Sequence, residues 1–157
     1  MNIKEAIYIE DGDVTVPVKG GLICHCVNDS KKMGSGVALA LLKKWSRVRS
    51  EYMNWDTGTF QLGDIQIVWV EKDLAVVNMI GQHGIAGDDP TPPIRYEAMR
   101  ECCNKVCMIA KRENIDVHMP YKIGSDRAGG KWDTILEIIK SELLDKGIQV
   151  YIYKFKE

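Results

Sequence analysis

Residues 21–45, GLICHCVNDSKKMGSGVALALLKKW, decide the fold that this sequence predicts. The segment begins with a short, mostly apolar run at 21–27, which is bounded by glycine before it and by Asn28-Asp29-Ser30 after it. Such a run is typical of a strand that is buried on both faces of a parallel or mixed sheet. After Met33-Gly34-Ser35-Gly36 the apolar spacing becomes helical, and one face carries Val37, Ala38, Leu41, Leu42 and Trp45. The segment therefore predicts a strand, a glycine-bearing loop and a helix, in that order.

The alternation of strands and helices continues on both sides of this segment. One helix is expected to begin at Thr91, which caps it. The helix after the second glycine-bearing loop is expected to carry Trp132, Ile135, Leu136, Ile139 and Leu143 on one face. Strands are expected at residues 3–9, 64–70, 74–80, 115–119 and 148–155, the second and third as a hairpin. This order predicts an α/β sandwich with a mixed sheet. A chain of 157 residues suits one domain with one core, which we expect to span residues 1–157.

The charge balance argues against a polymeric anion or a membrane as the partner. The chain has 21 Lys and Arg against 22 Asp and Glu, a net charge of −1. Binding to duplex nucleic acid needs a concentrated excess of cations, so we expect neither duplex nucleic acid nor a membrane surface to be bound. The N-terminal residues lack the apolar core of a secretion signal, and no apolar run reaches the roughly 20 residues of a membrane span. The sequence predicts a cytoplasmic protein.

The cysteines are expected to be free thiols rather than disulfides or metal ligands. The chain has five of them, at Cys24, Cys26, Cys102, Cys103 and Cys107. An odd number without a secretion signal indicates a reducing compartment. The spacing lacks the paired CxxC arrangement of zinc sites, so neither a metal nor another cofactor is expected.

A second glycine-bearing loop, Ile123-Gly124-Ser125-Asp126-Arg127-Ala128-Gly129-Gly130, also follows a strand and precedes a helix. Both loops should open at the carboxyl edge of the sheet, where ligands of α/β proteins bind. The first amides of a helix lack internal partners and favour an anion, so the two loops predict a diphosphate held from both sides. The alternative is that both are ordinary turns. Neither loop matches a Walker A sequence or the GxGxxG fingerprint.

These motifs resemble the macrodomain family. Residues 23–28 with 33–38 are similar to the family's strand, asparagine and first loop, and 119–132 are similar to its second loop. The helix start at 92–98 also resembles the family, and the likeness spans about residues 8–154. It is strongest toward the ADP-ribose-1''-phosphate phosphatases and the terminal ADP-ribose protein glycohydrolase. The resemblance implies a three-layer α/β/α sandwich with a mixed, mostly parallel central sheet, which binds ADP-ribose or a derivative.

The resemblance also implies which residues touch the ligand. Asn28 would face the distal ribose, and Leu22 with its apolar neighbours would line the adenine side. The diphosphate and ribose would be held by the two loops and by the end of the second hairpin strand. The implied residues are Gly34, Ser35, Gly36, Val37, Ala38, Gln82, Ile123, Gly124, Ser125, Asp126, Arg127, Ala128 and Gly129.

The chain departs from the family pattern at three places. Gly21 stands where many members carry an aspartate that accepts a hydrogen bond from adenine. Gln82 or His83, together with Ala128, stand where the glycohydrolase has its lysine and aspartate, so a lysine adduct is not expected. Asp126-Arg127 replaces the usual Gly-Leu and brings an acid and a base beside the expected phosphate.

Four side chains are candidates for chemistry: His25, Asn28, His83 and Asp126. His25 is either a core histidine or an acid–base group near the distal ribose, and His83 lies next to a glycine-bearing segment that resembles a lid. Asp126 either orients a water molecule or repels an anionic substrate. Two hypotheses follow: a hydrolase of ADP-ribose-1''-phosphate or an ADP-ribosyl ester, and a non-catalytic ADP-ribose binding module. An unrelated nucleotide-binding α/β protein is a third.

Overall fold

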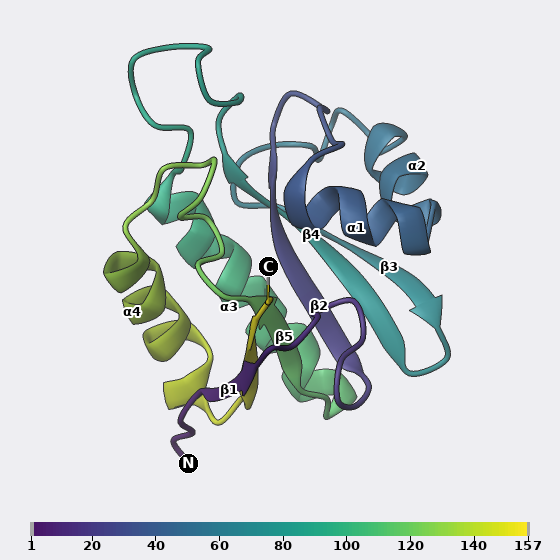
Figure 1. Ribbon diagram of the computed structural model, residues 1–157, viewed down its shortest axis with the longest axis vertical. Helices are drawn as coiled ribbons and strands as arrows, with labels where there is room; N and C mark the ends of the chain where they lie inside the picture. Colours follow the sequence, from purple (N-terminus) through teal and green to yellow (C-terminus); the bar gives the residue numbers. More distant parts are fainter. Residues whose placement is uncertain (1, 157) are drawn as a thin grey trace.

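The computed structural model describes residues 2–156, which form a central sheet covered by helices on both faces (Figure 1). The strand order is β1-β6-β5-β2-β4-β3. The strands are β1 (Ile7–Glu10), β2 (Gly21–Asn28), β3 (Ile65–Glu71), β4 (Leu74–Gln82), β5 (Val117–Pro120) and β6 (Val150–Lys154). Every neighbouring pair is parallel except β3 with β4, which is antiparallel. The expected mixed, mostly parallel sheet is therefore confirmed.

Two pairs of helices complete the three layers. The helices are α1 (Gly36–Lys44), α2 (Arg47–Met53), α3 (Tyr96–Glu113) and α4 (Trp132–Glu142), and a short 3-10 turn follows at Leu144–Lys146. Helices α3 and α4 lie on one face of the sheet, and α1 and α2 lie on the other (Figure 1). The expected three-layer α/β/α sandwich is confirmed.

The alternation of side chains along β2 explains why this strand lies in the centre. Leu22 and Cys24 belong to the apolar cluster under α3 and α4. Ile23 belongs to the cluster that includes Leu41 of α1 and Val48 of α2. Burial on both faces requires a nearly continuous apolar run, which is what residues 21–27 provide.

Two expected boundaries differ from the structure. Helix α3 begins at Tyr96 rather than after Thr91, because residues 93–95 bond to neighbouring segments instead of entering the helix. The carbonyl of Pro93 accepts from His83 N, and Arg95 N donates to Gly81 O. The first strand begins at Ile7 instead of residue 3. Helix α2, in addition, lies in a stretch for which the sequence predicted no regular element.

All five parallel strands end at the same edge of the sheet. The loops that follow β2 and β5 therefore open on one side, next to the connection from β4 to α3, which extends beyond the sheet (Figure 1). No helix within residues 2–156 is long and apolar enough to span a bilayer.

Candidate functional site

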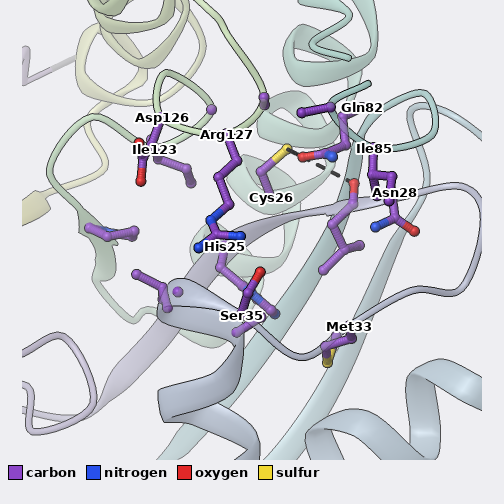
Figure 2. A pocket seen from close by; sticks show the side chains of 18 of the residues that line it. His25, Cys26, Asn28, Met33, Ser35, Gln82, Ile85, Ile123, Asp126 and Arg127 are labelled. Carbon is purple, nitrogen blue, oxygen red and sulfur yellow. Dashed lines mark hydrogen bonds between the residues drawn. The ribbon is translucent and has the colours of Figure 1, made fainter. Parts of the chain in front are cut away.

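A cavity of about 520 Å³ lies at the carboxyl edge of the sheet, between the two glycine-bearing loops (Figure 2). Most of the residues expected from the sequence line it. They are His25, Asn28, Gly34, Ser35, Gly36, Val37, Ala38, Gln82, Ile123, Gly124, Asp126, Arg127 and Ala128. The structure thus brings together segments that are some 90 residues apart in the chain.

Four of the expected residues lie outside the cavity lining: Leu22, His83, Ser125 and Gly129. Leu22 is fully buried near the start of β2, where its side chain packs in the core, and cannot contact a ligand. Gly21 also lies at this amino edge of the sheet, opposite the cavity. A ligand in the cavity would therefore not reach Gly21, because β2 begins at the edge of the sheet away from the cavity.

Asp13 is an acidic residue that follows a parallel strand but is not among the residues that line the cavity. It follows the carboxyl end of β1, and β1 runs parallel to β6 at the edge of the sheet where the cavity opens. Its Oδ1 accepts hydrogen bonds from the amide and the hydroxyl of Thr15, at 2.9 and 2.8 Å. In the sequence, Asp13 stands in the segment Asp11-Gly12-Asp13, to which no functional role was assigned.

Several lining residues were also not expected. They are Cys26, Val27, Lys32, Met33, Ile85, Ala86, Pro120, Tyr121 and Lys122. Most of these residues are next in sequence to an expected one. The predicted loops therefore line the cavity, but more of each loop does so than was predicted. Ile85 and Ala86 come from the connection between β4 and α3, the glycine-bearing segment that the sequence likened to a lid.

The N-terminus of α1 forms one wall of the cavity. The amides of Gly36, Val37 and Ala38 donate to no acceptor within the described chain, and the side chain of Ser35 does not cap them. Gly36 has φ +60°, a left-handed conformation that favours glycine, whereas Gly34 does not. A Cβ atom placed at either glycine would meet no atom within 4 Å. This wall offers three free donors and open space in front of them.

Asn28 holds the first loop in shape. Its Oδ1 accepts from Ser30 N and Lys32 N, both at 3.1 Å, and from the hydroxyl of Tyr52 at 2.7 Å. Its Nδ2 donates to Lys32 O at 2.6 Å. Asn28 is 5% exposed, so most of its hydrogen-bonding capacity serves the loop even though it lines the cavity.

The second loop forms the opposite wall. It is closed by hydrogen bonds from Ser125 N to Lys122 O and from Gly130 N to Gly124 O, both at 2.9 Å. The amides of residues 126–128 donate to no acceptor among residues 2–156. Both loops therefore contribute lining residues whose backbone amides have no partner in the described chain, and an anion would satisfy such amides.

His25 lies at the floor of the cavity, and a chain of amides fixes its protonation. Asn78 Nδ2 donates to Gln66 Oε1 at 3.0 Å and to Val48 O at 3.3 Å, so Asn78 Oδ1 is left to accept. His25 Nε2 lies 2.5 Å from that oxygen and must be the donor. Burial lowers the pKa of His25 to about 4, and the ring is neutral at pH 7. Its Nδ1 is then an acceptor without a partner among the described residues.

His83 and Asp29 form an exposed pair beside the cavity rather than inside it. His83 Nδ1 lies 2.7 Å from Asp29 Oδ2, while Asp29 Oδ1 accepts from Gly84 N at 2.8 Å. The pair ties the end of β2 to the beginning of the connection after β4. Its observed contacts are therefore structural.

The thiols offer no nucleophile or metal site in the described part of the chain. Cys26 is the cysteine that lines the cavity, and burial raises its pKa to about 12. Residues 2–156 contain no group of three His, Cys, Asp or Glu side chains placed to hold a metal ion.

Comparisons with known proteins were made for the whole chain. No family model matches it. A crystal structure of a protein from Bacteroides thetaiotaomicron is 44% identical, with a TM-score of 0.90 over 96% of this chain and 100% of that one. The mouse chromodomain-helicase-DNA-binding protein 1-like is 29% identical over 163 residues, which cover 96% of this chain and 18% of that protein. The chain thus spans about a fifth of the length of this curated relative.

A structure of a macrodomain protein from Streptomyces coelicolor is 35% identical, with a TM-score of 0.80 over 97% of this chain and all of that one. The Thermosipho africanus DarTG structure, in complex with ADP-ribose, is similar in fold alone, at 14% identity and a TM-score of 0.69 over 86% of this chain and 38% of that one. The likeness to the Streptomyces protein covers that chain from end to end. This protein belongs to the macrodomain family.

Proposed function

We propose that the protein binds ADP-ribose, or a derivative of it, in the cavity between the two loops. The observation that carries this proposal is the set of unpartnered amides at residues 36–38 and 126–128, on opposite walls. Two anionic groups joined by one bridging oxygen suit donors that approach from both sides. The DarTG structure with ADP-ribose supports the choice of ligand, since the folds agree.

We propose that the distal ribose and the adenine of the ligand lie at opposite ends of the cavity. The distal ribose lies near Asn28 and Gln82 in our proposal, because these residues line the cavity where β2 and β4 end. Adenine lies toward Tyr121, whose ring contacts Tyr8 of β1 edge to face. Asp13 follows β1 and keeps Oδ2 available, so we propose that it accepts from the adenine amino group.

For chemistry, we propose hydrolysis of ADP-ribose-1''-phosphate or an ADP-ribosyl ester, with water as the nucleophile. His25 lines the cavity and its Nδ1 has no partner among the described residues, so we propose that this atom accepts a hydrogen bond from the attacking water. Positioning and backbone donors would supply most of the rate. Asp126 also lines the cavity and stays a candidate to orient the water. We further propose that the protein works in the cytoplasm, which its free cysteines support.

The test is calorimetric binding of ADP-ribose and AMP to the wild type and to Gly34→Val. We expect ADP-ribose to bind far more tightly than AMP, and Gly34→Val to abolish its binding without loss of stability. Gly34 is preferred to Gly36 because its backbone accepts a side chain without strain. Gly58→Val, in an exposed turn away from the cavity, is the matched control.

Equal affinity for AMP and ADP-ribose would contradict the assignment of the site. Unchanged binding of ADP-ribose by Gly34→Val would contradict it as well. Phosphate release from ADP-ribose-1''-phosphate is measured on the same preparation. If the wild type binds ADP-ribose but hydrolyses no ADP-ribosyl substrate, the protein is a binding module.

A further inference from the structure

Arg127 is a charged side chain that lines the cavity and has no acidic partner among residues 2–156. It comes from the second loop and extends into the cavity toward the side formed by β2 and the first loop (Figure 2). Within residues 2–156 it takes part in no ion pair, although the same residues form eight others. An exposed arginine without a partner usually turns to solvent, whereas this one points inward.

The surroundings of Arg127 are also positive. The N-terminus of α1 contributes partial positive charge through its free amides, and the amides of residues 126–128 add to it. Lys32 and Lys122 line the same cavity, and Asp126 is the one acid among its described lining residues. The chain as a whole carries a net charge of −1, so this concentration of positive charge is local.

Lys122 and His25 are less suited to bring a positive charge to the middle of the cavity. The Nζ atom of Lys122 lies 5.6 Å from the centroid of the Tyr121 ring, which places its charge at that end. His25 on the floor is neutral, because burial holds its pKa near 4. Figure 2 shows the side chain of Arg127 extending from the second loop into the space between the two walls.

We propose that Arg127 is a specificity residue that clamps the diphosphate of the ligand. A guanidinium presents a planar fork of N–H donors, and this fork matches two neighbouring phosphate oxygens. The inference rests on the proposed function, and it adds to it a side chain that distinguishes a diphosphate from a monophosphate or a neutral nucleoside. The unliganded site holds repelling positive charges, and a diphosphate relieves that repulsion.

The test compares Arg127→Leu, Arg127→Lys and the wild type in titrations with ADP-ribose, adenosine and inorganic diphosphate. We expect Arg127→Leu to raise the Kd for ADP-ribose roughly tenfold to a hundredfold, as for a lost hydrogen bond to a charged group. The Kd for adenosine should not change. The Kd of Arg127→Lys for ADP-ribose should lie between those of the wild type and Arg127→Leu, because lysine keeps the charge but lacks the planar fork of donors. Arg49→Leu, on the exposed side of α2, is the matched control and should bind as the wild type does.

Salt gives a second readout. Raising the ionic strength should increase the Kd for ADP-ribose more in the wild type than in Arg127→Leu. Salt screens the charge of Arg127, which the variant lacks. Equal melting temperatures for the two proteins are expected, since Arg127 makes no contact that folding needs.

The outcomes separate this inference from the proposed function. If the wild type binds ADP-ribose and Arg127→Leu binds it equally well, the clamp is refuted and the proposed function stands. If ADP-ribose does not bind but diphosphate binds through Arg127, the clamp stands and the proposed function fails. If neither ligand binds the wild type, both are refuted.

Discussion

Acid should destabilise this protein through His25, which titrates differently in the folded and unfolded chain. The ordinary pKa of 6.5 applies when the chain is unfolded, and burial lowers it to about 4 in the fold, where His25 is 2% exposed. Between these values the unfolded state binds more protons, so the free energy of unfolding falls as the pH falls. The difference between the two pKa values corresponds to about 3 kcal/mol, lost progressively from about pH 6.5 to pH 4.

The assay is urea unfolding at pH 7.0 and at pH 4.5, for the wild type and for His25→Gln. A glutamine amide can still donate to Asn78 Oδ1 but does not titrate. Other groups, including the buried His118 whose pKa is also lowered, act equally in both proteins and cancel in the comparison. The wild type should lose about 2–3 kcal/mol more than the variant between the two pH values. Equal losses would refute the assignment of His25 as a buried neutral ring.

Two further predictions concern the site. Asn28→Ala should lower the free energy of unfolding by about 2 kcal/mol and weaken ADP-ribose binding, because it removes the hydrogen bonds that shape the first loop. Chemical denaturation and calorimetry measure both effects, and a variant with reduced turnover but unchanged stability and affinity would contradict this account. Asp13→Asn should raise the Kd for ADP-ribose without changing the melting temperature, since an asparagine keeps the Oδ1 acceptor for Thr15 but places a donor where Oδ2 was. Unchanged affinity in titration would show that Asp13 does not contact adenine.

The sequence predicted the sheet and the two facing loops because both depend on local signals. The apolar run at 21–27, the glycines after it and the helical spacing from Val37 are all readable within one segment. Residues 34–38 and 123–128 meet at one edge of the sheet because β2 and β5, the strands before them, are parallel, and the sequence predicted this edge without the strand order.

What the sequence did not predict depends on partners far apart in the chain. The helix start at Thr91 was wrong because the backbone of residues 93–95 bonds to β4 and to the second loop, which local capping patterns do not record. The protonation of His25 is fixed by Asn78, which lies 53 residues further along the chain. Asn78 is in turn oriented by Gln66, which is 12 residues away from it. Leu22 was misassigned because likeness in a motif does not state at which end of a strand a residue lies.

The segment that connects β4 to α3 is anchored only at its two ends. At the second end, Pro93 O accepts from His83 N, and Ile94 N donates to Ala128 O, so the anchor also fixes the second loop. Between the anchors, the hydrogen bonds of residues 85–91 are local, from Ile85 N to Asp88 and from Thr91 N to Asp89. This stretch can therefore vary in length or sequence while both anchors stay in place, and such changes would alter the part of the cavity that Ile85 and Ala86 line. Related proteins can diversify here, and an engineer can graft a new segment here to recognise whatever molecule is attached to the ligand.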